Sequence, residues 1–405
     1  MSNPEIRNRK YSHSAVSKPL HELGMTYTGL SGKVKEDFGH GDAHFITYMN
    51  VYKNAISAPD MVERIEIDNT QNKVEKGDIF FTTSSETPEE VGMSSVWKYD
   101  VDNLYLNSFC FGYRLFNKEK FDLDYLAYLF RSNEFRKNIQ LLAQGISRYN
   151  ISKTKCMDIN LVYTPNILEQ SFIGKFLVNI ESIIENKKLE LNKVNNYKKT
   201  MLYKMFPQKE KKVPEIRFKK YSGDYKTYHF KKCFQLSQGL QIPISSRLTR
   251  PAEDSYFYIT NEFLKSDSSI KYYIYKPNQS VICKKDDVLM TRTGNTGIAI
   301  TNVEGCFHNN FFKIDYDRKK FYNLYLLYLF QTSRMYNEIM SRAGASTIPD
   351  LKHKEFYDIR WELPLYDEQL EIGNFFYELD LLISSKEKEI DTLKYLKDTL
   401  ISKVF

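Results

Sequence analysis

Cysteine frameworks and metal-binding patterns are missing from this chain. Its 405 residues include five cysteines, an odd and widely spaced set without any CxxC pair. This pattern argues against a disulfide framework or a zinc ribbon, and it indicates a reducing compartment. The length predicts two or more domains instead, and an apolar content of 42% is enough to fill their cores.

Long uncharged apolar runs are also missing. The N-terminal passage MSNPEIRNRKYSHSAV has no apolar core of the kind found in signal peptides, and no stretch approaches the ~18 apolar residues of a membrane span. We therefore expect a soluble, cytoplasmic protein with no membrane partner. The net charge of +7 permits a nucleic acid or an acidic partner and requires neither.

The motifs of common catalytic sites do not occur. GLSGKVKE at positions 29–36 lacks the spacing and the final Ser or Thr of a phosphate-binding loop. The chain has no GxSxG, no HExxH and no Pro-Pro pair with which an adenine methyltransferase could hold a flipped base. His40 and His44 are four positions apart without an evident third ligand, which favours a solvated loop over a metal site. We expect a non-enzymatic chain without catalytic residues, metal or bound cofactor.

One passage of the sequence is written twice. TPNILEQSFIGKF begins at Thr164 and LPLYDEQLEIGNF begins at Leu363, with Pro, Glu, Gln, Ile, Gly and Phe in the same order and 199 positions apart. KKTMLYKMF at 198–206 matches the last residues, KDTLISKVF, at the same offset. Upstream, YLAYLFRSNEFRKNI parallels YLLYLFQTSRMYNEI at an offset of 200, and GDIFFTTSS parallels DDVLMTRTG at 209. Each unit is the size of a domain, so the pattern indicates a duplication.

Two textures alternate within each half. About 160 residues mix short apolar runs, such as HFITYMNV at 44–51 and DIFFTTSS at 78–85, with Gly, Asn and Ser turns, which predicts strands and loops with a few helices. One of these helices is expected over Asp124–Leu142. The last 40 residues of each half instead carry apolar residues at spacings of three and four over several heptads, which predicts long helices from Glu169 to Met205 and over the copy 199 positions later.

The apolar spacing is that of a coiled-coil seam, and each seam can pair with its own copy inside the chain. Antiparallel pairing of the two helices is the interpretation that we favour over separate packing of each helix on its own domain. The residues predicted for this spacer and for partner docking are Glu169, Gln170, Leu177, Ile180, Ile184, Leu191 and Val194, and Glu368, Gln369, Phe376, Leu379, Ile383, Ile390 and Leu393.

Polar loops that contain glycine lie at corresponding places in the two halves. Arg can read guanine, Asn and Gln can read adenine, and Ser, Thr and Lys can bind phosphate, although any surface loop carries such residues. The candidate DNA-binding residues are Ser31, Lys33, Lys35, His44, Tyr48, Asn50, Thr83, Ser84, Ser85, Arg148 and Tyr149 in the first half, and Gln238, Gln241, Arg247, Arg292, Thr293, Asn295, Arg342, Ser346 and Lys352 in the second.

These features together resemble the specificity subunit of type I restriction–modification systems. The resemblance rests on the paired P-x3-EQ-x2-IG-x-F passages, the helices that end in MLYKMFP and LISKVF, the VPEIRF linker, and the passages GLSGKVKEDFG, ITYMNVYKNA and KGDIFFTTSSETPEEVGMSSVW. It covers essentially the whole chain. It implies an α+β fold with two mixed α/β target recognition domains, at 1–163 and 208–362, separated by antiparallel coiled-coil helices at 164–207 and 363–405.

The resemblance also implies partners and a function. Each domain would read one half of a split, asymmetric DNA site. The helices would dock two methyltransferase subunits, which bind S-adenosylmethionine and methylate adenine at N6, and motor-nuclease subunits would add cleavage. The alternative is a duplicated coiled-coil scaffold without a DNA role, and salt-sensitive DNA binding by the assembled complex would separate the two.

Overall fold

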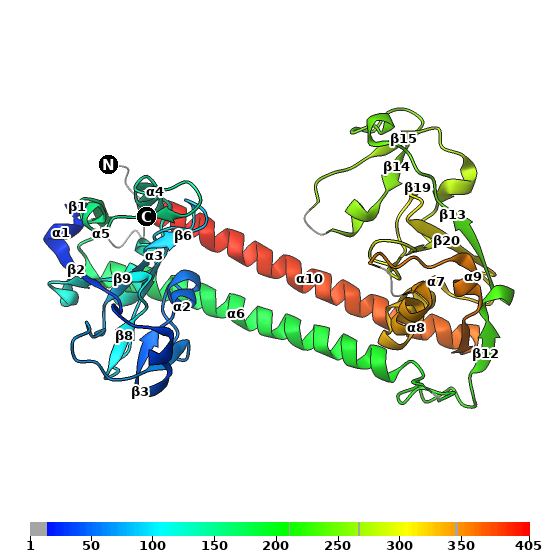
Figure 1. Ribbon diagram of the computed structural model, residues 1–405, viewed down its shortest axis with the longest axis horizontal. Helices are drawn as coiled ribbons and strands as arrows, with labels where there is room; N and C mark the ends of the chain where they lie inside the picture. The colour runs from blue at the N-terminus through cyan, green and yellow to red at the C-terminus, as the bar shows by residue number, and fades with distance from the viewer. Residues whose placement is uncertain (1–13, 210, 266–267, 345–346) are drawn as a thin grey trace. The chain divides into compact units, whose positions relative to one another are not determined.

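The computed structural model describes residues 14–209, 211–265, 268–344 and 347–405 (Figure 1). It divides into two compact units, one of residues up to Lys188 together with Lys388–Phe405, and one of Leu189–Glu387. Each unit therefore combines one globular part with a stretch of both long helices. We call residues 14–163 the first head and residues 226–363 the second head. The predicted boundaries of the four segments stay predictions.

The first head is built from two main sheets and two strand pairs, with short helices between them. One antiparallel sheet has the order β2-β9-β5-β7, and a second sheet has the order β4-β3-β8 with β3 and β8 parallel. The elements are β1 (Val16–Pro19), α1 (Leu20–Leu23), β2 (Gly24–Thr28), β3 (Phe38–Ile46), α2 (Tyr48–Lys53), β4 (Val62–Ile65), β5 (Ile79–Thr82), β6 (Ser84–Ser85), β7 (Ser94–Val96), β8 (Leu104–Leu106), β9 (Cys110–Leu115), α3 (Leu123–Leu129), α4 (Asn133–Gln140), β10 (Tyr149–Asn150), α5 (Lys153–Cys156) and β11 (Asn160–Tyr163).

The second head repeats this topology. Its sheets have the orders β13-β20-β17-β18 and β15-β14-β19-β16, again with a parallel pair, β14 and β19, and β12 pairs with β21 as β1 pairs with β11. The elements are β12 (Lys226–His229), β13 (Phe234–Gln238), β14 (Ser255–Ile259), β15 (Tyr273–Tyr275), β16 (Ile282–Cys283), β17 (Val288–Thr291), β18 (Ala299–Ile300), β19 (Gly305–Phe307), β20 (Phe311–Tyr316), α7 (Asn323–Gln331), α8 (Ser333–Ala343), α9 (His353–Tyr357) and β21 (Arg360–Leu363). The predicted mixture of helices and strands is thus confirmed, and the sequence repeat is a repeat of topology.

One local prediction was wrong in detail. The helix expected over Asp124–Leu142 is two helices, α3 and α4, because Ser132 begins a new helix by accepting a hydrogen bond from the backbone N–H of Phe135. The run HFITYMNV is a strand only as far as Ile46. The Thr47 side chain then caps α2 by accepting a hydrogen bond from the N–H of Asn50. The strand therefore ends at this cap, although the apolar run continues into the helix.

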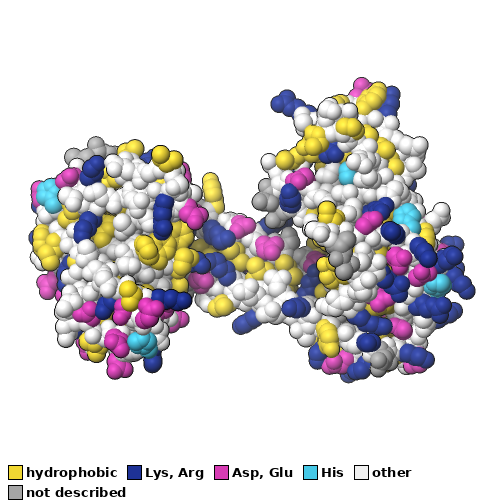
Figure 2. All heavy atoms as spheres, in the orientation of Figure 1, with side chains coloured by type: hydrophobic (Ala, Val, Ile, Leu, Met, Phe, Trp, Pro, Cys, Tyr) yellow, Lys and Arg dark blue, Asp and Glu magenta, His cyan; other side chains and the backbone are white. Residues whose placement is uncertain are grey.

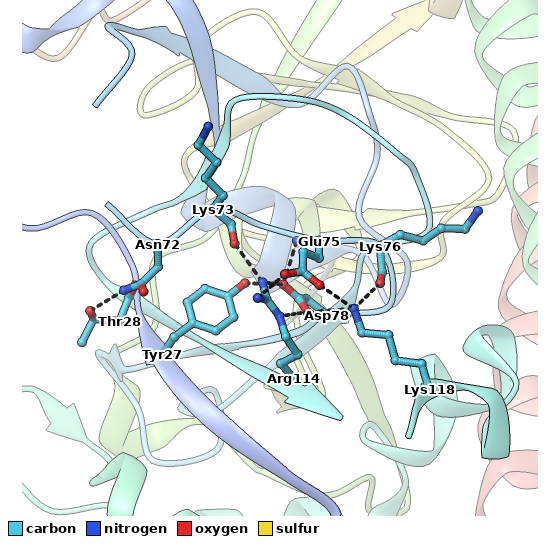
Figure 3. Close-up of polar contacts among 9 residues, drawn as sticks. All are labelled: Tyr27, Thr28, Asn72, Lys73, Glu75, Lys76, Asp78, Arg114 and Lys118. Carbon is cyan, nitrogen blue, oxygen red and sulfur yellow. Dashed lines mark hydrogen bonds and ion pairs between the residues drawn. The ribbon is translucent and has the colours of Figure 1, made fainter. Parts of the chain in front are cut away.

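A buried carboxylate anchors the start of β5 (Figure 3). Asp78 is fully buried and accepts hydrogen bonds from the Tyr27 hydroxyl at 2.8 Å, the Arg114 guanidinium at 2.7 and 2.9 Å, and the N–H of Glu75 at 2.8 Å. Burial, with the Asp78 carboxylate alongside, raises the pKa of Tyr27 well above its ordinary value. Paired in this way, the carboxylate is tolerated in the interior and fixes the strand that leads to Thr83.

The same anchor recurs in the second head. Asp287 accepts from the N–H of Lys284 at 2.8 Å and from the guanidinium of Arg318 at 2.6 Å, at the start of β17. In both GDIFF and DDVLM, the Asp side chain accepts from the N–H of the residue three positions earlier and so fixes the start of the strand.

The first turn of each long helix is tied to its head by a glutamine. In α6 (Ile167–Lys204), the Gln170 amide accepts from the N–H of Asp122 at 2.8 Å and donates to the carbonyls of Lys120 and Thr164. In α10 (Tyr366–Val404), Gln369 accepts from the N–H of Tyr322 at 3.1 Å and donates to the carbonyls of Lys320 and Pro364. The partners in the heads, Asp122 and Tyr322 and the two lysines, are related by the sequence repeat, which explains why the Gln of the EQ pair occurs twice.

A glycine one turn later allows the helix to cross closely over its head. A Cβ on Gly174 would lie 2.4 Å from the backbone nitrogen of Tyr125, and a Cβ on Gly373 would lie 2.8 Å from that of Tyr325. Contacts this short do not occur, so only glycine fits at either crossing. The repeated Gly is therefore a packing requirement between α6 and α3, and between α10 and α7.

Each unit also contains the end of the helix that starts in the other half of the sequence. In the first unit, the ring of Phe405 packs 5.2 Å from Tyr125, and Figure 1 shows the C-terminus beside α3 and α4. In the second, Phe206 packs 5.3 Å from Tyr325. The two phenylalanines and the two tyrosines are repeat equivalents, so the repeated final Phe fills the same position in each core.

The two helices run antiparallel in both units. Salt bridges join Glu181 to Lys397 and Lys187 to Glu389 in the first unit, and Glu190 to Lys386 and Lys198 to Asp380 in the second. As the residue number rises in one helix it falls in the other. Every residue of the predicted apolar seam is buried or half-buried, whereas exposed apolar residues such as Phe172 and Leu381 lie outside it.

We expect Gly174→Ala to destabilise the protein, although alanine normally stabilises a helix relative to glycine by about 0.5–1 kcal/mol. The added methyl group overpacks against a backbone atom, for which a cost of about 1–3 kcal/mol is typical. Thermal unfolding measures the change, with Ser182→Ala on an exposed position of the same helix as control. An unchanged or raised melting temperature for Gly174→Ala would contradict the close crossing.

Candidate DNA interface

Three segments that are distant in sequence meet in the first head. The N–H of Thr83 donates to the carbonyl of Phe109 at 2.8 Å, and the N–H of Ile151 donates to the carbonyl of Thr83 at 3.0 Å. The short strands β6 and β10 pair Ser85 with Tyr149 and Ser84 with Asn150. The structure thus brings together the predicted loops around Thr83 and Arg148 and adds the turn before β9.

The second head has the same three-segment junction. The N–H of Arg292 donates to the carbonyl of Asn310 at 2.7 Å, the N–H of Leu351 donates to the carbonyl of Arg292 at 2.9 Å, and Thr293 forms a bridge with Asp350. Thr83, Phe109 and Ile151 correspond to Arg292, Asn310 and Leu351 in these bonds. The backbone frame of the junction is therefore shared, while its side chains differ.

The junction in the first head carries aromatic and hydroxyl groups. The Tyr48 hydroxyl donates to the carbonyl of Ser84 at 2.8 Å, while Ser85 and Tyr52 donate to the Glu90 carboxylate at 2.9 and 2.6 Å. The hydrogen bonds from Tyr52 and Ser85 lower the pKa of Glu90. This set holds the loop after β5 in one conformation.

In the second head, the junction carries a continuous network of amides and one guanidinium. Arg292 donates to both carboxylate oxygens of Asp350, at 3.0 and 2.8 Å, and to the side-chain oxygen of Gln238 at 3.0 Å. Gln238 in turn donates to the carbonyl of Asn309, whose amide donates to Gln241. These groups are the types that bind guanine and adenine edges in the major groove.

A cationic stack flanks this network. The guanidinium of Arg247 lies 5.1 Å from the ring centroid of Tyr258 and 5.0 Å from that of Tyr272, and its Nε donates to the carbonyl of Ile242. Nδ1 of His308 accepts from the N–H of Asn310 at 3.0 Å. Burial and the nearby Arg247 lower the pKa of His308, which keeps the ring in the neutral form that can accept this bond.

Three of the residues predicted to contact DNA have buried side chains in the structure. Asn50 is fully buried and donates to the carbonyls of Ala58 and Met61. Ser84 and Ser85 lie inside the junction with 4% and 7% of their surface exposed. These side chains support the loops and are not available to a base.

The remaining predicted contacts differ in exposure. Lys33 is paired with Asp68 at 2.7 Å, and Arg342 is paired with Glu338, so both are engaged within the protein. Ser346 lies outside the described residues. Those exposed are Ser31, Lys35, Arg148, Gln238, Gln241, Asn295 and Lys352, and those half-buried are Lys33, His44, Tyr48, Thr83, Tyr149, Arg247, Arg292, Thr293 and Arg342.

Several residues of the junctions were not among the predicted contacts. They are Phe109, Glu90, Asn309 and Asp350. The turn before β9 joins the junction only through backbone bonds, which no side-chain pattern reveals. The offset of 201 that relates LYLNSF to GCFHNN was the available signal, because it places Phe109 opposite Asn310.

The predicted docking residues on the helices are mostly engaged in internal contacts. Gln170, Gln369 and Glu169 are buried at the helix starts, and Glu368 accepts from the Arg217 guanidinium at 2.8 Å and from Tyr225. Gln170 and Gln369 tie the helices to the heads, whereas Glu169 and Glu368 accept hydrogen bonds from the segments just outside them. Docking of a partner by these four residues stays a prediction. The apolar residues assigned to the spacer are buried or half-buried.

Charge alone does not mark a DNA-binding face. On the face drawn in Figure 2, basic and acidic side chains are interspersed over both units. Within the described ranges, no cluster of three or more His, Cys, Asp or Glu side chains could hold a metal ion, and no helix is long and apolar enough to cross a membrane. The junctions are therefore the best-defined candidate sites of the described part of the chain.

We expect His308 and His353 to titrate below the ordinary histidine value of ~6.5. Burial lowers both pKa values, with Arg247 and Arg292 as the nearby charges. Because the neutral form is favoured in the folded state, their contribution to stability is complete above pH ~6.5 and is lost as pH falls through the folded pKa. NMR titration of the ring protons tests this, with His308→Gln to assign one signal. Midpoints at or above 6.5 would contradict it.

Comparison with known proteins agrees with the resemblance seen in the sequence. The family described as type I restriction modification DNA specificity domain matches residues 222–395. The type I restriction enzyme MjaVIII specificity subunit of Methanocaldococcus jannaschii is 26% identical over 154 residues, 38% of this chain and 36% of that protein. The putative MjaX specificity subunit of the same organism is 22% identical over 293 residues, 71% of this chain and 68% of that protein.

Solved structures show the same fold over the whole chain. The S subunit of a type I restriction–modification system from M. genitalium superposes with a TM-score of 0.58 at 15% identity, over 100% of this chain and 99% of that one. A chain from a structure of complex assembly and conformational transition of the type I R-M system gives 0.61 at 13% identity, over 97% and 98%. The family match, both relatives and the shared fold point to the same group of proteins: this chain is similar to the specificity subunits of type I restriction–modification systems.

Proposed function

We propose that this chain reads a split, asymmetric DNA site for a type I restriction–modification complex, with one half-site for each head. It would work in the cytoplasm on double-stranded DNA. The similarity to specificity subunits supports a role in specificity for this chain, with catalysis in other subunits. The finer roles below are part of the proposal.

The observation that carries the proposal is the pair of matched junctions. Each presents loops on the same backbone frame, yet one offers Phe109, Arg148 and Tyr149 and the other offers Gln238, Gln241 and Arg292. A shared frame with different side chains is what two readers of different base sequences require. A scaffold that docks identical partners on both halves would gain nothing from this difference.

The long helices supply the other two parts of the proposal. Their seam would act as a spacer between half-sites, and their outer surface would dock two methyltransferase subunits. α6 exposes Leu168, Phe172, Phe176 and Ile183 at spacings of four and seven residues, with the rings of Phe172 and Phe176 stacked. An exposed apolar stripe of this kind suits a protein partner. The methyltransferases would bind S-adenosylmethionine and methylate adenine at N6, and motor-nuclease subunits would cleave.

Single-molecule sequencing of host DNA for N6-methyladenine tests the function. We expect a split, asymmetric methylated motif when the chain is co-expressed with its neighbouring methyltransferase subunit, and no such motif in a matched strain without the chain. A soluble complex that produces no motif would favour the scaffold alternative.

The spacer role predicts that matched heptad deletions change the gap between half-sites. Deleting 186–192 from α6 and 385–391 from α10 preserves the apolar period and shortens each helix by about 10.5 Å, close to the rise of three base pairs. We expect the methylated motif to keep both half-sites with a spacer shortened by about three base pairs, or recognition to be lost. Deleting only one of the two segments, which breaks the pairing register, is the control. An unchanged spacer in the double deletion would contradict the proposal.

A further inference from the structure

A short turn precedes β9 in the first head and β20 in the second. The hydrogen bonds of this turn are alike in both heads, but the residue at its tip differs. In the first head, the N–H of Phe109 donates to the side-chain oxygen of Asn107 at 2.9 Å, and the N–H of Cys110 donates to the carbonyl of Asn107 at 3.0 Å. In the second, the N–H of Asn310 donates to Nδ1 of His308 at 3.0 Å, and the N–H of Phe311 donates to its carbonyl at 2.9 Å. Phe109 and Asn310 are therefore equivalent tips.

The tip side chain has no role in holding the turn together. All the bonds that fix the turn come from the backbone and from the residue two positions earlier, Asn107 or His308. The carbonyl oxygen of Phe109 accepts a hydrogen bond from the N–H of Thr83, so the tip lies in the three-segment junction. A phenylalanine that is 54% exposed here is not required by the fold.

A cation accompanies the exposed ring. The guanidinium carbon of Arg148 lies 5.6 Å from the ring centroid of Phe109, within the range of a cation–π contact. Arg148 is exposed, and no salt bridge to it is found among the described residues. An apolar face beside an uncompensated positive charge matches the edge of a DNA groove, where a base methyl group lies near phosphate oxygens.

We propose that Phe109 is a specificity-determining residue that contacts the 5-methyl group of a thymine in the half-site read by the first head, with Arg148 on the neighbouring backbone phosphate. Phenylalanine is one of the apolar side chains that recognise thymine through this methyl group in the major groove. At the equivalent tip the second head has Asn310, an amide that suits hydrogen bonding to a base edge. The inference rests on the proposed function and names the chemistry of one of its two sites.

The test replaces thymine by deoxyuridine, which lacks only the methyl group. Once the methylated motif is known, the complex of the full chain with its methyltransferase subunits is titrated with duplexes in which each thymine of either half-site is replaced in turn. We expect one replacement to weaken binding about fourfold, the effect of removing one buried methyl group. Phe109→Asn places at this tip the residue type that the second head has there. This variant should bind the duplex with thymine and the duplex with deoxyuridine equally.

Phe116 provides a matched control. It is 65% exposed and follows β9 directly, whereas Phe109 precedes it, so the two phenylalanines lie at opposite ends of one strand. Phe116→Asn should keep the fourfold preference for thymine, and Phe109→Leu should keep part of it. Thermal unfolding of all three variants checks that the fold is unchanged.

Two results would overturn the inference while leaving the proposed function intact. They are specific binding that is indifferent to every deoxyuridine, and a preference that persists in Phe109→Asn. Failure of the wild-type complex to distinguish its motif from unrelated DNA would instead overturn the proposed function itself.

Discussion

A side-chain amide at the start of each long helix fixes the position of that helix against its head. Gln170 and Gln369 each satisfy one backbone N–H and two backbone carbonyls that a helix crossing would otherwise leave buried without partners. A glutamate could accept but not donate, and a leucine could do neither, so only an amide of this length meets both needs. The glycine crossing one turn later depends on the helix being held at that angle.

Because these contacts are made of backbone groups, they constrain the sequence more strongly than packing alone does. Residues of the apolar seam differ between the halves, and Leu177, for example, corresponds to Phe376 in the repeat. The Gln, the Gly and the final Phe are the same in both halves. Apolar residues of similar volume can replace one another in a core at small cost. A donor–acceptor pair and a missing Cβ have no such substitutes.

The long helices and the duplication could be predicted from the sequence, because periodicity and internal repetition are local signals. The positions of Asn50, Ser84 and Ser85 could not, because a short polar residue in a loop reads the same whether it binds a ligand or caps a neighbouring backbone group. Phe109 was missed for the converse reason. An aromatic residue beside a strand suggests the core, and only the fold reveals that the turn directs it outward.

The two junctions separate the groups that build a recognition site from the groups that read with it. The backbone groups of Thr83 and Arg292 make the same hydrogen bonds in the two heads. The junction therefore keeps its backbone frame whichever side chain stands at this position. Arg292 is a partial exception, since Asp350 and Gln238 hold its guanidinium in a fixed plane. A guanidinium held in this way loses little rotamer freedom on binding a base edge, whereas Arg148 lies on a ring in an exposed loop. Under the proposed function, the second head would read with a preorganised network, and the first with a ring and a cation that adjust to the groove.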